Sequence, residues 1–146
     1  MQVEFSYDRA GSRLRQIGDL QISNDRGGSR DKTFGHLEID YDFAGSRLRH
    51  VGKDQIEYDK LGSRPVRFGE PGLEYDRFGS WLVRIGNMGI DYDMAGSRVR
   101  RVGGSAVDYD RRGTRPRYLR ADGEALIDDR MCVIVFLVLV AFDLDA

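Results

Sequence analysis

A phrase of 17 residues repeats along this chain, and it limits the folds that the chain can adopt. Each copy contains an aspartate at the same place, namely Asp8, Asp25, Asp42, Asp59, Asp76, Asp93 and Asp110. In its full form the phrase reads Tyr-Asp-x-x-Gly-Ser-Arg, then an apolar and basic stretch, a second Gly and an Ile. A copied unit of this size buries its apolar face only against its neighbours. The sequence therefore predicts an array of seven units, the first starting at Tyr7, within a single domain of residues 1–146.

Two glycines in each unit predict two turns. The first is present in all seven units, and the second recurs at Gly18, Gly35, Gly52, Gly69, Gly86 and Gly103. Glycine at a fixed place supplies the positive φ that tight hairpin turns need. Two turns in 17 residues leave room for two strands of about five residues each. The repeat region, residues 7–120, thus predicts an all-β fold, an antiparallel meander of about 14 short strands.

Charge chooses between two registers for the hairpin, taken here in the third unit. With a two-residue turn, Tyr41 faces Leu48 and Asp40 faces Arg49, so charged positions share one face and apolar positions the other. A three-residue loop would place Arg49 on the apolar face, which costs desolvation. Cross-strand pairs of opposite charge contribute ~0.2–1 kcal/mol each, and we expect the first register. A one-residue bulge near His50 then returns the following valine to the core face.

A parallel β-solenoid, with one coil per repeat, is the alternative architecture. It would stack the aspartates of successive units directly over one another, and the arginines likewise. Like charges in register are destabilising, whereas an antiparallel meander interleaves them. Charge therefore favours the meander.

The tail, residues 121–146, differs from the repeats. It holds an apolar run of 12 residues, Met131–Phe142, which follows two potential helix-capping residues, Asp128 and Asp129. Its β-branched content is also typical of a strand, but a helix that is apolar all round must be buried all round. A sheet of about 14 strands at ~4.8 Å spacing is ~67 Å wide, close to the circumference of a tube that holds one helix. We therefore predict that the sheet curls around this segment, a short helix, as a barrel or an open crescent.

Charge and hydropathy argue against a nucleic-acid partner, a membrane span and a secretory signal. The chain has 23 basic and 24 acidic residues, a net charge of −1, and a nucleic-acid binder normally carries a basic excess. The apolar run is shorter than the ~17–25 residues of a membrane-spanning helix. The N-terminus lacks the basic and then apolar pattern of a secretory signal. We expect a soluble protein, cytoplasmic by default.

Most residues that carry chemistry elsewhere are repeat positions here. His36 and His50 have no second His or Cys at zinc-ligand spacing. The Asp-x-x-Gly loop offers one carboxylate, whereas calcium takes about six to eight oxygens. The serine after each turn glycine recurs without any histidine, which is typical of a turn residue and not of a nucleophile. The single Cys132 lies in the apolar run and is expected to be a buried thiol. The sequence predicts no enzyme, metal or cofactor.

Departures from the repeat are the candidates for individual function. In the fifth unit Trp81 stands where most units have Arg, with Val83 beside it on the outer face and Phe78 nearby at the turn. An exposed Trp can anchor a protein partner or a sugar ring. A drifted repeat, or contact with a second copy of the chain, is the favoured explanation. In the second unit Asn24 replaces Tyr and Asp31 replaces the core aliphatic residue, so we expect this unit to be the weakest packed.

The phrase Tyr-Asp-x-x-Gly-Ser-Arg resembles the YD repeat of Rhs-type proteins, whose phrase is close to Tyr-Asp-x-x-Gly-Arg. The matching stretches are Tyr41–Arg47, Tyr58–Arg64 and Tyr92–Arg98, with Tyr75–Gly79 less complete. In that family long β-hairpin arrays wind into shells that enclose toxin segments. The resemblance implies a β-sheet scaffold, although this repeat is shorter and places Ser between Gly and Arg.

These observations predict a non-enzymatic β-repeat scaffold or interaction module. Such a module would bind a protein partner, or self-associate through sheet edges or through its tail. The alternative is a carbohydrate-binding, lectin-like repeat protein with several shallow sites for a glycan. That alternative predicts aromatic residues recurring on the outer face, where Trp81 and Tyr118 come closest.

Overall fold

The computed structural model describes residues 1–8, 13–24, 31–41, 47–59, 64–76, 81–93, 98–110, 115–121 and 126–141. It contains one sheet of 14 strands and one α-helix that continues as a π-helix. The strands are β1 (Gln2–Tyr7), β2 (Leu14–Ile17), β3 (Leu20–Asn24), β4 (Asp31–Phe34), β5 (Leu37–Tyr41), β6 (Leu48–Val51), β7 (Asp54–Tyr58), β8 (Pro65–Phe68), β9 (Leu73–Tyr75), β10 (Leu82–Ile85), β11 (Met88–Tyr92), β12 (Val99–Val102), β13 (Ser105–Tyr109) and β14 (Pro116–Ala121). The helical segments are α1 (Asp129–Phe136) and η1 (Leu137–Ala141).

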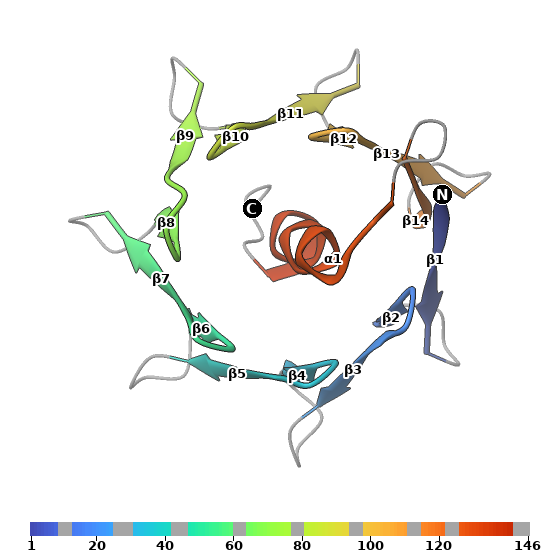
Figure 1. Ribbon diagram of the computed structural model, residues 1–146, viewed down its shortest axis with the longest axis horizontal. Helices are drawn as coiled ribbons and strands as arrows, with labels where there is room; N and C mark the ends of the chain where they lie inside the picture. The colour runs from blue at the N-terminus through green and yellow to red at the C-terminus, as the bar shows by residue number, and fades with distance from the viewer. Residues whose placement is uncertain are drawn as a thin grey trace.

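The strands form a nearly closed barrel (Figure 1). Consecutive strands pair antiparallel, and β1 also pairs with β14, so the first and last strands lie side by side. The remaining ends of the sheet, β8 and β9, are consecutive in the chain. They meet through an isolated bridge between Arg67 and Gly72, and the Phe68 N–H donates to the Pro71 carbonyl at 3.0 Å. The predicted antiparallel meander is confirmed, and it takes the barrel form.

In the third unit, β5 and β6 form the hairpin across the first turn. Its register follows the prediction at one pair of residues and departs from it at the next. Tyr41 faces Leu48 as expected, but Asp40 faces His50 and not Arg49. The expected pairing of Asp40 with Arg49 is wrong because the bulge falls at Arg49 itself. Ile39 can then face Val51 across the core. The register shifts at the corresponding place in all seven such hairpins.

The second turn is a glycine turn, as predicted. Its six glycines have φ between 58° and 62°, the region that side chains disfavour. A Cβ on Gly35 would lie 2.6 Å from Leu20 Cδ2, and one on Gly52 would lie 2.8 Å from Leu37 Cδ2. Glycine is therefore needed both for the backbone angle and for the close approach of the preceding unit. The first-turn glycines, and Phe78, lie outside the described residues.

Seven cross-strand pairs of buried apolar residues form the inner wall. One member of each pair precedes the first turn and the other precedes the second, so the 17-residue period places all seven at one level. The pairs are Phe5–Ile17, Ile22–Phe34, Ile39–Val51, Ile56–Phe68, Leu73–Ile85, Ile90–Val102 and Val107–Leu119.

The apolar tail lies inside the barrel as a helix (Figure 1). Asp128 is the N-cap, and its carboxylate accepts a hydrogen bond of 2.9 Å from the Met131 N–H. Phe136 is 1% exposed and stacks on Phe34 of the wall, with ring centroids 4.9 Å apart. A segment enclosed by a closed sheet finds no free strand edge, and a helix pairs its own backbone groups. Within the described residues, no helix has both the length and the hydropathy of a membrane span.

Candidate functional site

Tyrosine, arginine and aspartate side chains form a belt around the barrel, at the end where the strands enter the first turns. Each tyrosine ends the strand that leads into that turn, and the aspartate and arginine flank the turn. The belt consists of Tyr7, Tyr41, Tyr58, Tyr75, Tyr92 and Tyr109, of Arg47, Arg64, Arg98 and Arg115, and of Asp59, Asp93 and Asp110.

Each belt tyrosine holds together two strands that are paired only near their turn. The described pairs of β6 with β7 are His50–Gln55 and Val51–Asp54, both beside the second turn. Nearer the belt, the Tyr58 hydroxyl on β7 donates to the Leu48 carbonyl on β6 at 2.5 Å. Tyr41, Tyr75, Tyr92 and Tyr109 donate in the same way to the carbonyl ten residues earlier, at 2.5 to 2.8 Å. A side chain thus satisfies a backbone acceptor that these two strands do not share through their ladder.

Each belt arginine connects its own unit to the next. The Arg98 guanidinium lies 4.6 Å from the centroid of the Tyr109 ring, and its Nε lies 2.9 Å from an Asp93 carboxylate oxygen. The Asp93 N–H also donates to the Arg98 carbonyl at 2.9 Å. Arg64 repeats this arrangement, with Tyr75 at 4.4 Å and Asp59 at 3.8 Å. The residue spacing of the phrase is therefore the spacing that this chain of contacts needs.

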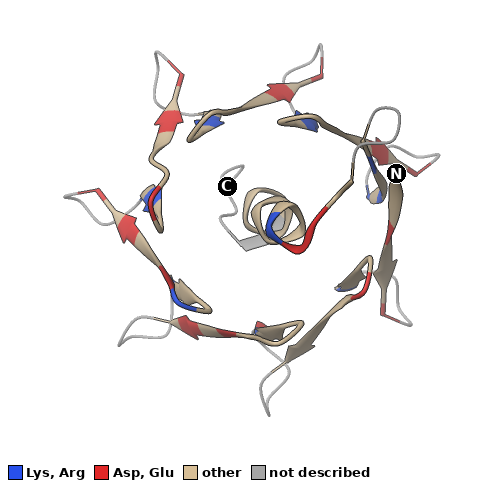
Figure 2. Ribbon diagram, in the orientation of Figure 1, with Lys and Arg blue, Asp and Glu red and all other residues tan. Residues whose placement is uncertain are grey.

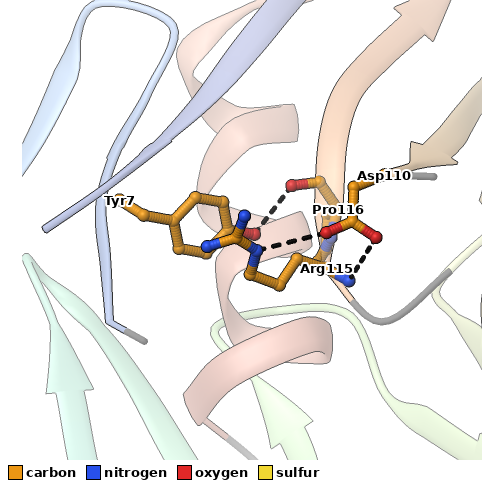
Figure 3. Close-up of polar contacts among 4 residues, drawn as sticks. All are labelled: Tyr7, Asp110, Arg115 and Pro116. Carbon is orange, nitrogen blue, oxygen red and sulfur yellow. Dashed lines mark hydrogen bonds and ion pairs between the residues drawn. The ribbon is translucent and has the colours of Figure 1, made fainter. Parts of the chain in front are cut away.

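The belt continues from the last strand of the sheet, β14, to the first, β1 (Figure 3). The Tyr7 hydroxyl donates to the Pro116 carbonyl at 2.7 Å, and Arg115 lies over the Tyr7 ring at 4.8 Å. Arg115 in turn lies 3.3 Å from Asp110. Burial raises the pKa of Tyr7 to about 12, against the opposing charge of Arg115, and Asp110 adds to the rise.

Trp81, the first predicted site residue, occupies the arginine position of the belt. Its ring meets Tyr92 edge-on, with centroids 4.5 Å apart, where other units place a guanidinium over the tyrosine. Trp81 is half-buried, and so is Val83 at the bulge of β10. The sequence signalled Trp81 by its departure from Arg, but it did not reveal the tyrosine that the ring contacts.

In the second unit a polar cluster stands at the tyrosine position of the belt. The Asn24 amide donates to the Asp31 carboxylate at 2.8 Å, and Arg15 donates to the Asn24 side-chain oxygen at 2.9 Å. Burial raises the pKa of Asp31, and the nearby charge of Arg13 opposes the rise. Asp31 is half-buried at a position where Leu48 and Leu82 are buried in other units.

Two further features could have carried chemistry, namely the thiol of Cys132 and a hollow in the outer wall. Cys132 is buried in α1, and burial raises the pKa of its thiol to about 11, with Asp129 and Asp128 adding to the rise. A hollow of about 440 Å³ opens between β12 and β13, and the belt residues Arg98 and Tyr109 line it.

The described residues contain no cluster of three or more His, Cys, Asp or Glu side chains that could hold a metal ion. Sequence reasoning placed acidic and basic positions on one face of the hairpin, but it anticipated neither the tyrosine hydroxyl bonds nor the stacking. No protein-family model, curated protein or solved structure matches this chain.

Proposed function

We propose that this protein is a non-enzymatic scaffold that serves as an interaction module, binding a protein partner or further copies of itself. The observation that carries the proposal is the belt, in which tyrosine hydroxyls bond to backbone carbonyls and arginines pair with aspartates. These repeated polar groups hold strands together, and their geometry resembles no arrangement of nucleophile and base. The barrel interior is occupied by the protein's own helix, which leaves the outer wall for contacts.

The outer wall suits protein contacts because its charges are balanced and exposed. Acidic and basic residues are interspersed around the ring (Figure 2). Cross-strand ion pairs join Arg67 to Glu57 at 3.3 Å and Arg84 to Glu74 at 3.6 Å. Exposed pairs of this kind contribute about 0–1 kcal/mol each. Their side chains can therefore turn to a partner of complementary charge at small cost.

The resemblance to the YD repeat supports the same proposal. In that family β-hairpin arrays act as enclosing walls, and here the phrase lines a wall that encloses a helical tail. The common role would be that of a scaffold whose repeated residues stabilise the wall itself.

Sedimentation velocity and a glycan array on one preparation test the proposal. We expect self-association that rises with concentration, or a complex with an isolated protein partner, and no retained glycan. Glycan binding by Trp81→Ala, compared with that by the matched outer-face variant Val83→Ala, distinguishes the proposed scaffold from the lectin alternative. Glycan binding that Trp81→Ala abolishes and Val83→Ala retains would overturn the proposal in favour of a carbohydrate-binding protein.

A further inference from the structure

The contact between the first and last strands of the sheet copies the contact between strands joined by a turn. Across this terminal seam, formed by β1 and β14, Leu119 pairs with Val3 and Tyr118 pairs with Glu4. Leu119 and Val3 occupy the repeat positions of Val51 and Asp54, which pair across the second turn of the third unit. Tyr118 and Glu4 likewise match His50 and Gln55. The seam therefore has the hairpin register without the covalent link.

The side chains of the seam match those of the internal contacts as well. The interaction of Arg115, Pro116 and Tyr7 reproduces that of Arg47, Leu48 and Tyr58, respectively (Figure 3). The guanidinium-to-ring distances are 4.8 Å at the seam and 4.6 Å inside the chain. Both the backbone register and the belt thus treat the first strand as the next repeat after the last.

The sequence departs from the repeat at the seam in the way that a junction without a turn requires. Arg120 stands at the place of the turn glycine Gly52, and Gln2 stands at that of Lys53. These two residues pair with each other, so both strands run straight on. The Ala121 N–H then donates to the Met1 carbonyl at 2.9 Å. The outer edges of β1 and β14 are therefore fitted to each other.

We infer that the terminal seam is exchangeable, so that β14 of one copy can accept β1 of a second copy of this chain. Such a contact joins different surfaces of the two copies, head to tail, and it adds repeats without changing the register. Within one chain the effective concentration of β1 is on the order of millimolar, which favours the closed barrel in dilute solution. Exchange becomes competitive when chains fold together at high concentration. This inference rests on the self-association included in the proposed function. It identifies the terminal seam as the surface through which copies associate.

Cysteine pairs across the seam test the exchange in the full-length chain. Opposed residues of an antiparallel pair have Cα atoms roughly 4.5–5.5 Å apart, within the range of about 4.4–6.8 Å that a disulfide requires. In a Cys132→Ala background, one chain carries Gln2→Cys and another carries Arg120→Cys. The two chains are unfolded, mixed, refolded together over a range of concentrations and mildly oxidised. The double variant in one chain, refolded in dilute solution, reports the closed barrel.

We expect the mixed chains to give a disulfide-linked pair whose fraction rises with concentration, and the double variant to close on itself. Arg49→Cys mixed with Arg84→Cys, both exposed on the outer wall, measures random collisions. Glu4→Cys with Tyr118→Cys, a second opposed pair of the seam, repeats the test if the first pair impairs folding. Cross-linking no greater than in the collision control, or a double variant that folds but fails to close, would overturn the inference. Self-association by sedimentation without seam cross-links would also overturn it while leaving the proposed function intact.

Discussion

At the residue scale, the tyrosine of the phrase performs three tasks that no other residue type combines. Its ring covers apolar wall, its face carries the guanidinium of the preceding unit, and its hydroxyl reaches a backbone carbonyl of the neighbouring strand. An arginine over an aromatic face contributes about 0.5–1 kcal/mol at an exposed site, and a hydrogen bond contributes about 0.5–1.5 kcal/mol. Repeated around the ring, these small terms select one register for the whole array.

The half-buried tyrosines predict that alkaline pH destabilises the barrel. Burial raises the pKa of Tyr7 and of Tyr75 to about 12, from the ordinary value of 10.0. Because the folded-state pKa is the higher one, the stabilisation is complete below pH 10 and is lost as pH rises through about 12. We expect the urea midpoint to fall over this window, with tyrosinate absorbance rising in step with unfolding. Tyrosines that ionise near pH 10 in a chain with unchanged circular dichroism would contradict this expectation.

Restoring the consensus residues of the repeat in the second unit is expected to stabilise the protein. Asp31→Leu restores the aliphatic residue of other units, and Asn24→Tyr beside it restores the belt. Because burial raises the pKa of Asp31, its charged form weakens the fold once pH exceeds the ordinary carboxyl value. We expect the double variant to gain about 1–2 kcal/mol in the free energy of unfolding at pH 7, and less at pH 3. Leu48→Asp, the reverse change in the third unit, is the matched control and should destabilise. Urea titrations measure both, and an unchanged or weakened repair variant would contradict the prediction.

At the scale of elements, the sequence predicts the strands and the second turns because both depend on local rules. Alternation at Ile39, Asp40 and Tyr41 indicates a strand, and a fixed Gly52 indicates a positive-φ turn. The bulge at Arg49 was harder to place, since it depends on which residues must face the core from both turns at once. The helix was ambiguous for a similar reason. Periodicity is silent in an all-apolar segment, and only its enclosure by the sheet decides in favour of α1.

The orientation of α1 within the ring predicts a measurable pairwise coupling. Seven similar units offer the helix seven similar settings, and within the described residues an ion pair between Arg130 and Asp54 breaks this equivalence. Asp54 stands at the repeat position of Leu20 and Leu37, and it accepts a hydrogen bond of 2.5 Å from Arg130 of α1. The Arg130 guanidinium also lies 4.5 Å from the centroid of the Phe68 ring.

A double-mutant cycle of Asp54→Ala and Arg130→Ala tests this orienting role. Both side chains are partly exposed, so we expect a coupling energy of only about 0.5–1 kcal/mol from urea unfolding. The same cycle with Asp19→Ala, another acidic residue near the second turns, should give a coupling near zero. Equal couplings for the two aspartates would mean that no single contact orients the helix.

At the scale of the whole molecule, arithmetic on the repeat predicts the curl of the sheet but not its closure. Strand number and spacing give a width that suits one enclosed helix. Closure depends on whether β1 and β14 meet in register, which involves residues more than a hundred positions apart. The part of the belt at the seam was also beyond prediction, because Tyr7 and Arg115 come together only once the ring is formed. The outward charges of Asp and Arg were visible in the sequence, whereas the tyrosine hydroxyl's acceptor was not.

Because the tail fills the interior of the barrel, we predict that the barrel does not fold stably without it. In the full chain α1 buries Val135 and Phe136 inside the barrel, and η1 buries Leu137, each at most 1% exposed. Deletion of residues 125–146 would leave the seven buried pairs of the wall facing an empty interior. Removing one buried Phe side chain alone costs about 3–5 kcal/mol, and a domain of this size is stabilised by only about 5–15 kcal/mol. We expect the truncated chain to lose cooperative urea unfolding and to aggregate.

Phe136→Ala is the graded companion to the deletion, and Cys132 supplies its measurement. The thiol is buried and its raised pKa keeps it protonated near neutral pH, so labelling requires release of the helix. We expect the logarithm of the labelling rate of Phe136→Ala to rise in proportion to its loss of global stability, because labelling follows the population of the open state. Leu126→Ala, a change at an exposed side chain, is the unaffected control. If the truncated chain were soluble and unfolded cooperatively, the wall would be self-sufficient. The helix would then occupy the barrel without being required for its stability.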